Sequence, residues 1–374
     1  MGFPLFDLIP ELMASVPRAP LGEFPTPVQS LERLSRALEV SSDAWVKRDD
    51  LSSPVYGGNK VRTLELLFGE ALALGRPRVL ATGAFGSNHA LASALHAPRV
   101  GLEPSALLFP QPVSQAALVN LQALVDSGVA LHAVPHWSAL PLGMAWQRLA
   151  APAPYVMTPG GATPRGALGY VSAGLELGRQ IAAHELPVPR RVIVGVGSTC
   201  TSAGLLVGLA LSAHFRLGFE PSSLPWLISV RVSPWPVTSR WRILHLAART
   251  ARLVHELSAG RVPLFDHDAL GARFAVDGGF LGPGYGEASK AGDEAEALWR
   301  REGLPALDGT YSAKAAARVV AGLRAREVGP ALFWSTKSSV PLPVRHEAVA
   351  NAAVPAQIRA WLFRGERALA PFGR

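Results

Sequence analysis

Short apolar runs alternate along the chain with longer stretches in which apolar positions recur every three or four residues. Runs of about four to eight residues predict buried strands, and the helical spacing predicts amphipathic helices. The predicted strands cover residues 78–82, 105–109, 155–158, 191–196, 226–232 and 331–334. The predicted helices cover about 61–67, 87 onward, 115–127, 166–183, 203–215, 238–257 and 312–327. Apolar strands separated by helices are typical of parallel sheets covered on both faces, so the pattern predicts an α/β architecture.

Length and composition narrow the class of protein. The chain has 374 residues, a length beyond which one hydrophobic core usually stops growing, and this favours two domains. Hydrophobic residues make up 49% and charged residues 17%, which excludes a disordered chain. No stretch of about twenty residues is free of polar groups, so no membrane-spanning helix is predicted. Residues 1–13 lack a basic region followed by a long apolar run, so we expect a soluble, cytoplasmic protein.

Cysteine content and charge exclude further classes. The single cysteine, Cys200, rules out a disulfide within the chain and a cysteine-based zinc site, and we expect no metal. The net charge is +8, but the arginines are spread along the sequence. The densest basic group, Arg240, Arg242, His245, Arg249 and Arg252, falls on one predicted helix. Because no aromatic or glycine-rich binding motif accompanies it, a solvated helix face is favoured and a nucleic-acid-binding module remains a distant alternative.

One of the five lysines, Lys60, has an unusual setting. It ends the segment Tyr-Gly-Gly-Asn-Lys at residues 56–60, where two glycines permit close backbone approach directly before a predicted helix. A lysine that forms a Schiff base needs a partly desolvated amine fixed at the edge of a pocket, which this turn could supply. Taken alone, the segment is explained better by a turn that leads into a helix with an exposed lysine.

Two further segments place polar groups at helix starts. Residues 82–89 form a strand end, a glycine-bearing turn and a Ser-Asn start that suits a substrate carboxylate, although an ordinary N-cap explains Ser87 as well. Residues 195–204 bring backbone N–H groups and hydroxyls to a second helix start, which favours a phosphate. Cys200 stands where the third glycine of GxGxxG would be, and no Gly-Lys-Ser/Thr follows. The phosphate of a cofactor smaller than a dinucleotide is therefore expected.

Together these segments resemble the D-cysteine desulfhydrase and 1-aminocyclopropane-1-carboxylate (ACC) deaminase family of pyridoxal 5′-phosphate (PLP) enzymes, which has the tryptophan-synthase-β fold, or fold type II. The resemblance runs from residue 24 to 334 and is strongest at 47–51 and 56–62. It implies PLP held as a Schiff base on Lys60, in a cleft between two domains that are each a mainly parallel, open twisted sheet flanked by helices. The implied large domain is 1–64 with 170–374, and the small domain is 65–169. The resemblance also implies a homodimer.

Individual site residues follow from the same resemblance. Asn88 is expected to contact the pyridine hydroxyl, and the Ser-Asn-His loop to bind the substrate carboxylate. The expected cofactor-binding residues are Lys60, Asn88, Gly197, Ser198, Thr199, Cys200, Thr201 and Thr336. The expected substrate-binding residues are Ser87, Asn88, His89, Tyr285 and Tyr311, and the expected catalytic residues are Lys60, Ser87, Tyr285 and Tyr311.

Departures from the family pattern bear on the reaction. His89 stands where ACC deaminases usually have Gln, and Ser312 where they have a Glu near the pyridine nitrogen. A hydroxyl there leaves the ring a weaker electron sink, which favours β-elimination from D-cysteine or a related amino acid to give a 2-oxo acid and ammonia. ACC deamination and a diverged relative with another reaction, or with none, are the alternatives. Residues 335–338, Ser-Thr-Lys-Ser, replace His-Thr-Gly-Gly, while Phe85-Gly86 and the tail beyond Pro341 have no counterpart.

Overall fold

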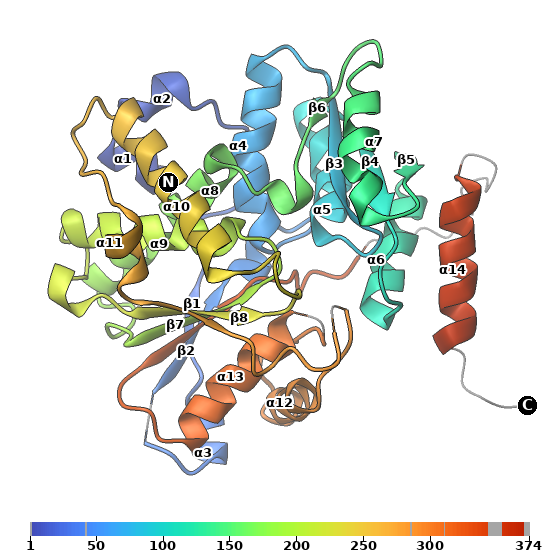
Figure 1. Cartoon of the computed structure of the whole chain (residues 1–374). Helices are drawn as coiled ribbons and strands as arrows, with labels where there is room; N and C mark the ends of the chain where they lie inside the picture. Colours follow the sequence, from blue (N-terminus) through green and yellow to red (C-terminus); the bar gives the residue numbers. More distant parts are fainter. Residues whose placement is uncertain (1, 42, 285, 310, 343–353, 370–374) are drawn as a thin grey trace, which may run out of the picture.

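The computed structural model describes residues 2–41, 43–284, 286–309, 311–342 and 354–369, and its strands form two sheets (Figure 1). The larger sheet has six strands in the spatial order β1 (Val28–Ser30), β2 (Ala44–Arg48), β10 (Ala331–Ser335), β7 (Arg191–Val196), β8 (Trp226–Arg231) and β9 (Phe274–Asp277). Among the described strand pairs of this sheet, only β1–β2 is antiparallel. The smaller sheet is parallel, in the order β5 (Ala130–Ala133), β4 (Glu103–Phe109), β3 (Arg78–Ala84) and β6 (Tyr155–Val156).

Helices cover both faces of the larger sheet. Alternate strand residues face opposite sides, so Val192 and Val194 of β7 join one core while Ile193 joins the other. The first core contains α1 (Pro4–Leu8), α2 (Leu12–Ser15), α8 (Pro164–Ala182), α9 (Cys200–His214), α10 (Arg240–Leu257) and α11 (His267–Gly271). The second contains α3 (Glu32–Ala37), α12 (Lys290–Arg301) and α13 (Ser312–Arg324). The predicted α/β architecture is confirmed.

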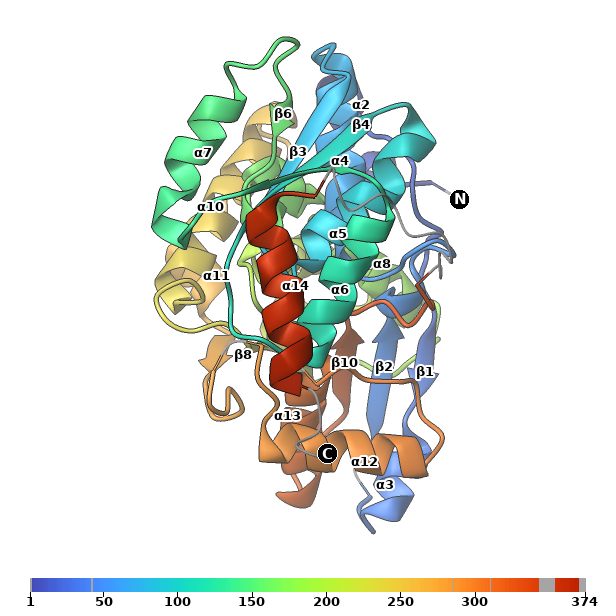
Figure 2. The same cartoon turned by 90° about the vertical axis from the view of Figure 1, so that its right-hand side faces the viewer.

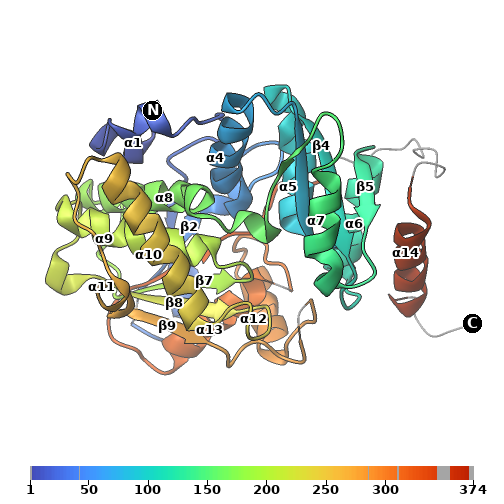
Figure 3. The same ribbon diagram turned by 45° about the horizontal axis from the view of Figure 1, so that its top comes forward.

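The smaller sheet is covered in the same way (Figure 3). Val79 and Ala81 of β3 face a core shared with α4 (Asn59–Ala73), α5 (Asn88–His96), α6 (Gln115–Asp126) and α14 (Ala356–Leu369). Leu80 faces the other side, towards α7 (Leu140–Gln147). Helix α4 contributes to the cores of both sheets, because Phe68 packs in the core of the smaller sheet and Leu66 packs in that of the larger. The domain boundaries 1–64, 65–169 and 170–374 remain a prediction.

Helix α14 lies against α6, on the outer side of the smaller sheet (Figure 2). Ile358 is fully buried, and the Trp361 ring stacks on Phe85 with ring centroids 5.6 Å apart. Gly365 fits against Leu118 of α6, where a Cβ would lie 2.4 Å from a Leu118 methyl carbon. The two features without a family counterpart, Phe85 and the tail, therefore contact each other. Among the described helices, none is long and apolar enough to cross a membrane.

Candidate active site

The predicted site segments lie at the carboxyl ends of strands from both sheets. Residue Ser87 follows β3, Gly160 follows β6, Gly197 follows β7, and Thr336 follows β10. Ligands of open α/β sheets bind outside the carboxyl ends of the strands. The fold therefore brings together segments that are far apart in the sequence.

Lys60 lies in the first turn of α4, and the glycine pair before it is needed for close packing. Gly58 has φ of 96°, and a Cβ there would lie 2.6 Å from the Thr336 carbonyl oxygen. The Lys60 side chain is 9% exposed, and its Nζ donates to Ser198 Oγ at 3.2 Å and to the Gly160 carbonyl at 3.4 Å. Burial lowers the pKa of Lys60. In the described chain no carboxylate forms an ion pair with this amine. The lowered pKa favours the neutral, nucleophilic form of the amine.

Two buried polar side chains in this region have atoms that no described residue satisfies. His89 is 1% exposed, and neither ring nitrogen has a hydrogen-bond partner in the described part of the chain. The Thr158 hydroxyl, just before Gly160, is also unpaired there. Burial, together with the nearby Lys60 charge, lowers the pKa of His89 to about 3, so this imidazole is neutral. Unpaired buried polar atoms are uncommon and mark this region as a place where a ligand is expected.

The predicted phosphate segment is shorter than the sequence suggested, because α9 begins at Cys200 and not at 203. Ser198 and Thr199 precede the helix, and the N–H groups of its first turn lack intrahelical partners. Thr201 Oγ1 accepts a hydrogen bond from Asn59 Nδ2 at 2.9 Å. The Cys200 thiol instead donates to the Gly161 carbonyl at 3.3 Å, and burial raises its pKa. Cys200 therefore offers an anion its backbone N–H and not its thiol.

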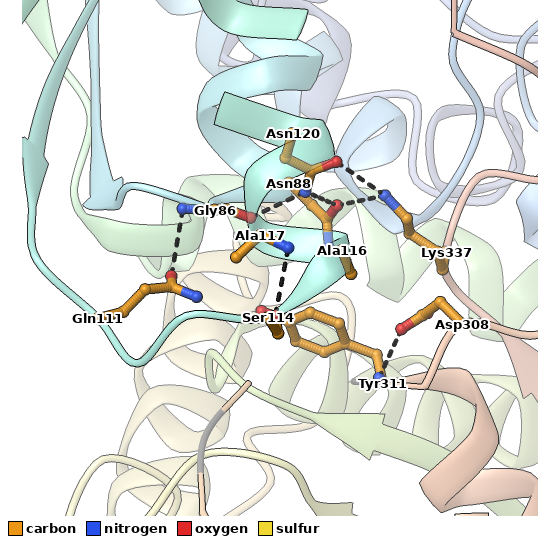
Figure 4. A pocket seen from close by; sticks show the side chains of 10 residues that line it. All are labelled: Gly86, Asn88, Gln111, Ser114, Ala116, Ala117, Asn120, Asp308, Tyr311 and Lys337. Atoms are coloured by element: carbon orange, nitrogen blue, oxygen red, sulfur yellow. Dashed lines mark hydrogen bonds between the residues drawn. The ribbon is translucent and has the colours of Figure 1, made fainter. Parts of the chain in front are cut away.

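A polar pocket lies between loops of the two sheets (Figure 4). Gly86, Asn88 and Asn120 come from the elements around the smaller sheet, and Asp308, Tyr311 and Lys337 from those around the larger sheet. Asn88 Oδ1 accepts from Lys337 Nζ at 2.7 Å, from Asn120 Nδ2 at 2.8 Å and from Tyr56 Oη at 3.0 Å. Three donors fix which way this amide points, and its Nδ2 remains for a ligand. Ser87 caps α5 by accepting from Ala90 N at 3.3 Å.

Tyr311 joins the pocket to the phosphate segment. Its ring packs so closely on Gly197 that a Cβ there would lie 2.9 Å from Tyr311 Cε1. The neighbouring Ser312 is buried, and its hydroxyl donates to Asp308 Oδ2 at 3.0 Å. The Asp308 carboxylate also accepts from the N–H groups of Tyr311 and Ser312. The negative charge of Asp308 therefore lies at the N-terminus of α13, where the helix dipole favours it. The predicted site residue Tyr285 lies outside the described residues.

A buried ion network lies behind Lys60. Arg62, two residues further along α4, donates to both carboxylate oxygens of Asp49, at 2.9 and 2.8 Å, and to both oxygens of Glu176. Lys47 donates to Glu176 at 2.6 Å, and the Tyr170 hydroxyl to Asp49 at 2.6 Å. In the interior, the two positive charges of Lys47 and Arg62 thus balance the two negative charges of Asp49 and Glu176. They anchor the helix turn that carries Lys60.

Sequence reasoning placed Lys60, Ser198, Asn88 and Tyr311 in one region but missed other members of the site. Among the pocket residues that it did not name are Gln111, Ser114 and Asn120, and Gly160 is the missed neighbour of Lys60. A Cβ on Gly160 would lie 2.4 Å from Ser198 Oγ, so only glycine fits there. The Gly-Gly pair after the strand at 155 was a signal that could have found it. Lys337 was noted only as a departure from the family pattern.

Comparisons with known proteins relate the chain to pyridoxal-phosphate dependent enzymes. A family model described as pyridoxal-phosphate dependent enzyme matches residues 19–231. The chain is 32% identical to nocardicin C-9′ epimerase of Nocardia uniformis subsp. tsuyamanensis, over 87% of this chain and 94% of that one. It is 32% identical to D-cysteine desulfhydrase of Salmonella choleraesuis (strain SC-B67), over 88% and 96%. A crystal structure of an ACC deaminase homologue superposes with a TM-score of 0.70 at 27% identity, covering 90% of this chain and 95% of the other.

Proposed function

Because the chain belongs to the family of pyridoxal-phosphate dependent enzymes, in its D-cysteine desulfhydrase and ACC deaminase group, and uses PLP, we propose that it is a lyase. Its reaction is the elimination and deamination of a small amino acid, D-cysteine or a related β-substituted one, to a 2-oxo acid and ammonia. One observation carries the proposal: the buried Lys60 amine is hydrogen-bonded to Ser198 at the start of α9, next to a polar pocket.

The residues present fit the cofactor. Lys60 offers an amine whose pKa burial lowers, and the open first turn of α9 offers N–H groups for the cofactor phosphate. The unpaired ring nitrogens of His89 are buried polar atoms that need a partner, and Asn88 Nδ2 is a further donor in the same region. Thr336 lies at the end of β10, where its hydroxyl would meet the ring nitrogen.

PLP supplies an electron sink that stabilises negative charge at the substrate Cα. In our proposal Lys60 Nζ, once released from the cofactor, takes the proton from Cα, which requires the neutral amine that burial favours. Ser87 and the N–H groups at the start of α5 bind the substrate carboxylate. Tyr311, packed against Gly197, closes the site on the side of the larger sheet.

Ser312 supports elimination over ACC ring opening. Its hydroxyl is neutral and already donates to Asp308, while the Asp308 carboxylate is held by N–H groups of α13. A weak electron sink favours substrates whose β-substituent leaves readily, and ACC has no such group. Homodimer formation, a cytoplasmic location and the division into two domains are part of the same proposal.

Epimerisation is a second candidate, because the chain is similar to nocardicin C-9′ epimerase along most of its length. Both reactions begin with removal of the Cα proton, but an epimerase returns a proton to Cα and keeps the β-substituent. The products therefore distinguish the two: a 2-oxo acid and ammonia in one case, the opposite stereoisomer in the other.

We expect purified protein to convert β-chloroalanine or D-cysteine to a 2-oxo acid with kcat/KM at least about tenfold above that for ACC, because one unfavourable step of about 1.4 kcal/mol already gives that ratio. The measurement is 2-oxo acid formation from D- and L-cysteine, β-chloroalanine, cysteate, serine and ACC, with chiral chromatography of unreacted amino acid. More efficient turnover of ACC would replace the proposal with ACC deamination. Stereochemical inversion without 2-oxo acid would establish the epimerase.

A further inference from the structure

Lys337 takes part in a hydrogen-bond network that joins loops of the two sheets (Figure 4). It lies two residues beyond the end of β10, and its backbone forms an isolated bridge with Gly58. Its ammonium donates to Asn88 Oδ1 at 2.7 Å, to Tyr56 Oη at 2.8 Å and to Asn120 Oδ1 at 3.3 Å. These three bonds use all the N–H groups of the ammonium, so its role lies within the network.

The Lys337 ammonium sets the direction of every bond in this network. It donates hydrogen bonds and accepts none, whereas an amide or a hydroxyl can do either. Each side-chain atom that it contacts is therefore an acceptor oxygen. Asn120 Nδ2 is left to donate to the Gly86 carbonyl and to Asn88 Oδ1, both at 2.8 Å. The Tyr56 hydroxyl donates to the same Asn88 oxygen at 3.0 Å.

The network leaves one group of Asn88 for a ligand. Asn88 Oδ1 accepts from three donors, while Nδ2 donates to no residue in the part of the chain that the structure describes. Asn88 is the first residue of α5, after the carboxyl end of β3, in the region of the site that contains Lys60. A ligand atom beside Nδ2 must be an acceptor. PLP has such an atom, because its ring oxygen stands next to the carbon that joins a lysine.

We propose that Lys337 is a positioning residue, which holds the Asn88 amide so that Nδ2 donates to the ring oxygen of PLP. The inference rests on the proposed function for the placement of PLP at Lys60, and not on which amino acid reacts. Lys337 itself does not touch the cofactor. It acts through Asn88, by fixing the orientation of the amide and by adding a positive charge behind it.

This arrangement affects the nitrogen that joins Lys60 to PLP. The donated hydrogen bond and the Lys337 charge stabilise negative charge on the ring oxygen and disfavour a proton on the linking nitrogen. They therefore lower the pKa of that nitrogen. The other titratable groups of the region are Asp308 and Tyr311, which line the pocket, and His89 on α5. The Asp308 carboxylate offsets part of the Lys337 charge.

The test is a pH titration of the visible absorbance of PLP-loaded protein, which needs no substrate. The band changes when the linking nitrogen loses its proton. Lys337→Met removes the charge and keeps a chain of similar length, while Lys337→Arg keeps a cation that can only donate. Tyr56→Phe removes another hydrogen bond to the same Asn88 oxygen but leaves the ammonium in place. Lys290→Met, which removes an exposed lysine of α12, is the control for charge at a distance.

We expect the pKa of the linking nitrogen to rise by about one pH unit in Lys337→Met, the lower end of what a charge a few ångströms away causes. Lys337→Arg and Lys290→Met should titrate like wild type. Tyr56→Phe should shift the pKa less than Lys337→Met does, because the positive charge remains. Circular dichroism in the far ultraviolet checks that each variant is folded.

An unchanged or lowered pKa in Lys337→Met would overturn the proposal, as would an equal rise in Lys337→Arg or in Tyr56→Phe. If Lys337→Met does not retain PLP, Lys337→Gln is titrated in its place with the same expected rise, since its neutral amide both donates and accepts. Loss of the visible band in every Lys337 variant would make Lys337 the lysine that carries PLP, and the proposal would be wrong. Protein that shows the expected titrations but forms no 2-oxo acid from any amino acid would refute the lyase and leave this proposal standing.

Discussion

Lys60→Ala protein is expected to turn over its substrate at least about 10³-fold more slowly than wild type, because it loses both the covalent anchor and the base that takes the Cα proton. Cofactor should still bind weakly through the start of α9, since that turn does not depend on Lys60. Borohydride reduction followed by peptide mass spectrometry measures the anchor directly. Wild-type protein should carry the label on the peptide that contains Lys60, and the variant should carry none.

Lys337 makes this experiment informative, because a second amine lies in the same region of the protein. Label on the peptide containing Lys337 in wild-type protein would show that the anchor had been assigned to the wrong lysine. Lys290→Ala, at an exposed position of α12, is the control and should be labelled and active like wild type.

Replacing Asp49 with Asn is expected to lower the free energy of unfolding by about 3–5 kcal/mol, the usual cost of removing one partner from a buried ion pair. The change leaves Lys47 and Arg62 with only the Glu176 carboxylate in a fully buried setting. Urea denaturation at neutral pH measures it. Glu32→Gln is the control, because the Glu32–Arg36 pair is 67% and 70% exposed and such pairs contribute about 0–1 kcal/mol.

The pH dependence of the same variant gives an independent check. Burial alone would raise the pKa of Asp49, but the charge and hydrogen bonds of Arg62 lower it to about 2, below its ordinary value of 3.8. The stabilisation is therefore complete above about pH 4 and is lost as the pH falls towards 2. The difference in unfolding free energy between wild type and Asp49→Asn should shrink over that range. A difference that is constant with pH would mean that packing, and not charge, accounts for the loss.

The parallel strands could be predicted because their residues are apolar on both faces, as in β7, where Val192 and Ile193 enter different cores. Strand β2 was missed for the opposite reason. It carries Lys47 and Arg48, whose charges suggest exposure, yet both are buried. Lys47 pairs with Glu176, far away in the sequence, and Arg48 pairs with Asp50, two residues further on. Helix α14 was missed because its apolar residues form a core face only where the helix packs against α6.

The functional site likewise contains residues that could be predicted from the sequence and residues that could not. Lys60 and the start of α9 could be found because glycines and hydroxyls mark local backbone geometry. The role of Lys337 depends on how the end of β10 meets α5 and α6, and no local pattern encodes that contact. Cys200 was expected to bind the cofactor because the resemblance placed it in the phosphate segment, but its thiol is turned towards the Gly161 carbonyl.

The stacking of Trp361 on Phe85 joins positions 276 apart in the sequence (361 minus 85). While the ribosome synthesises the protein, the loop after β3 and the outer side of α6 emerge long before the helix that covers them. Leu118 and Phe85 are then open to water and to chaperones that bind exposed apolar surface. A nascent chain that ends before α14 therefore leaves Phe85, the neighbour of the pocket residue Gly86, without the ring that covers it.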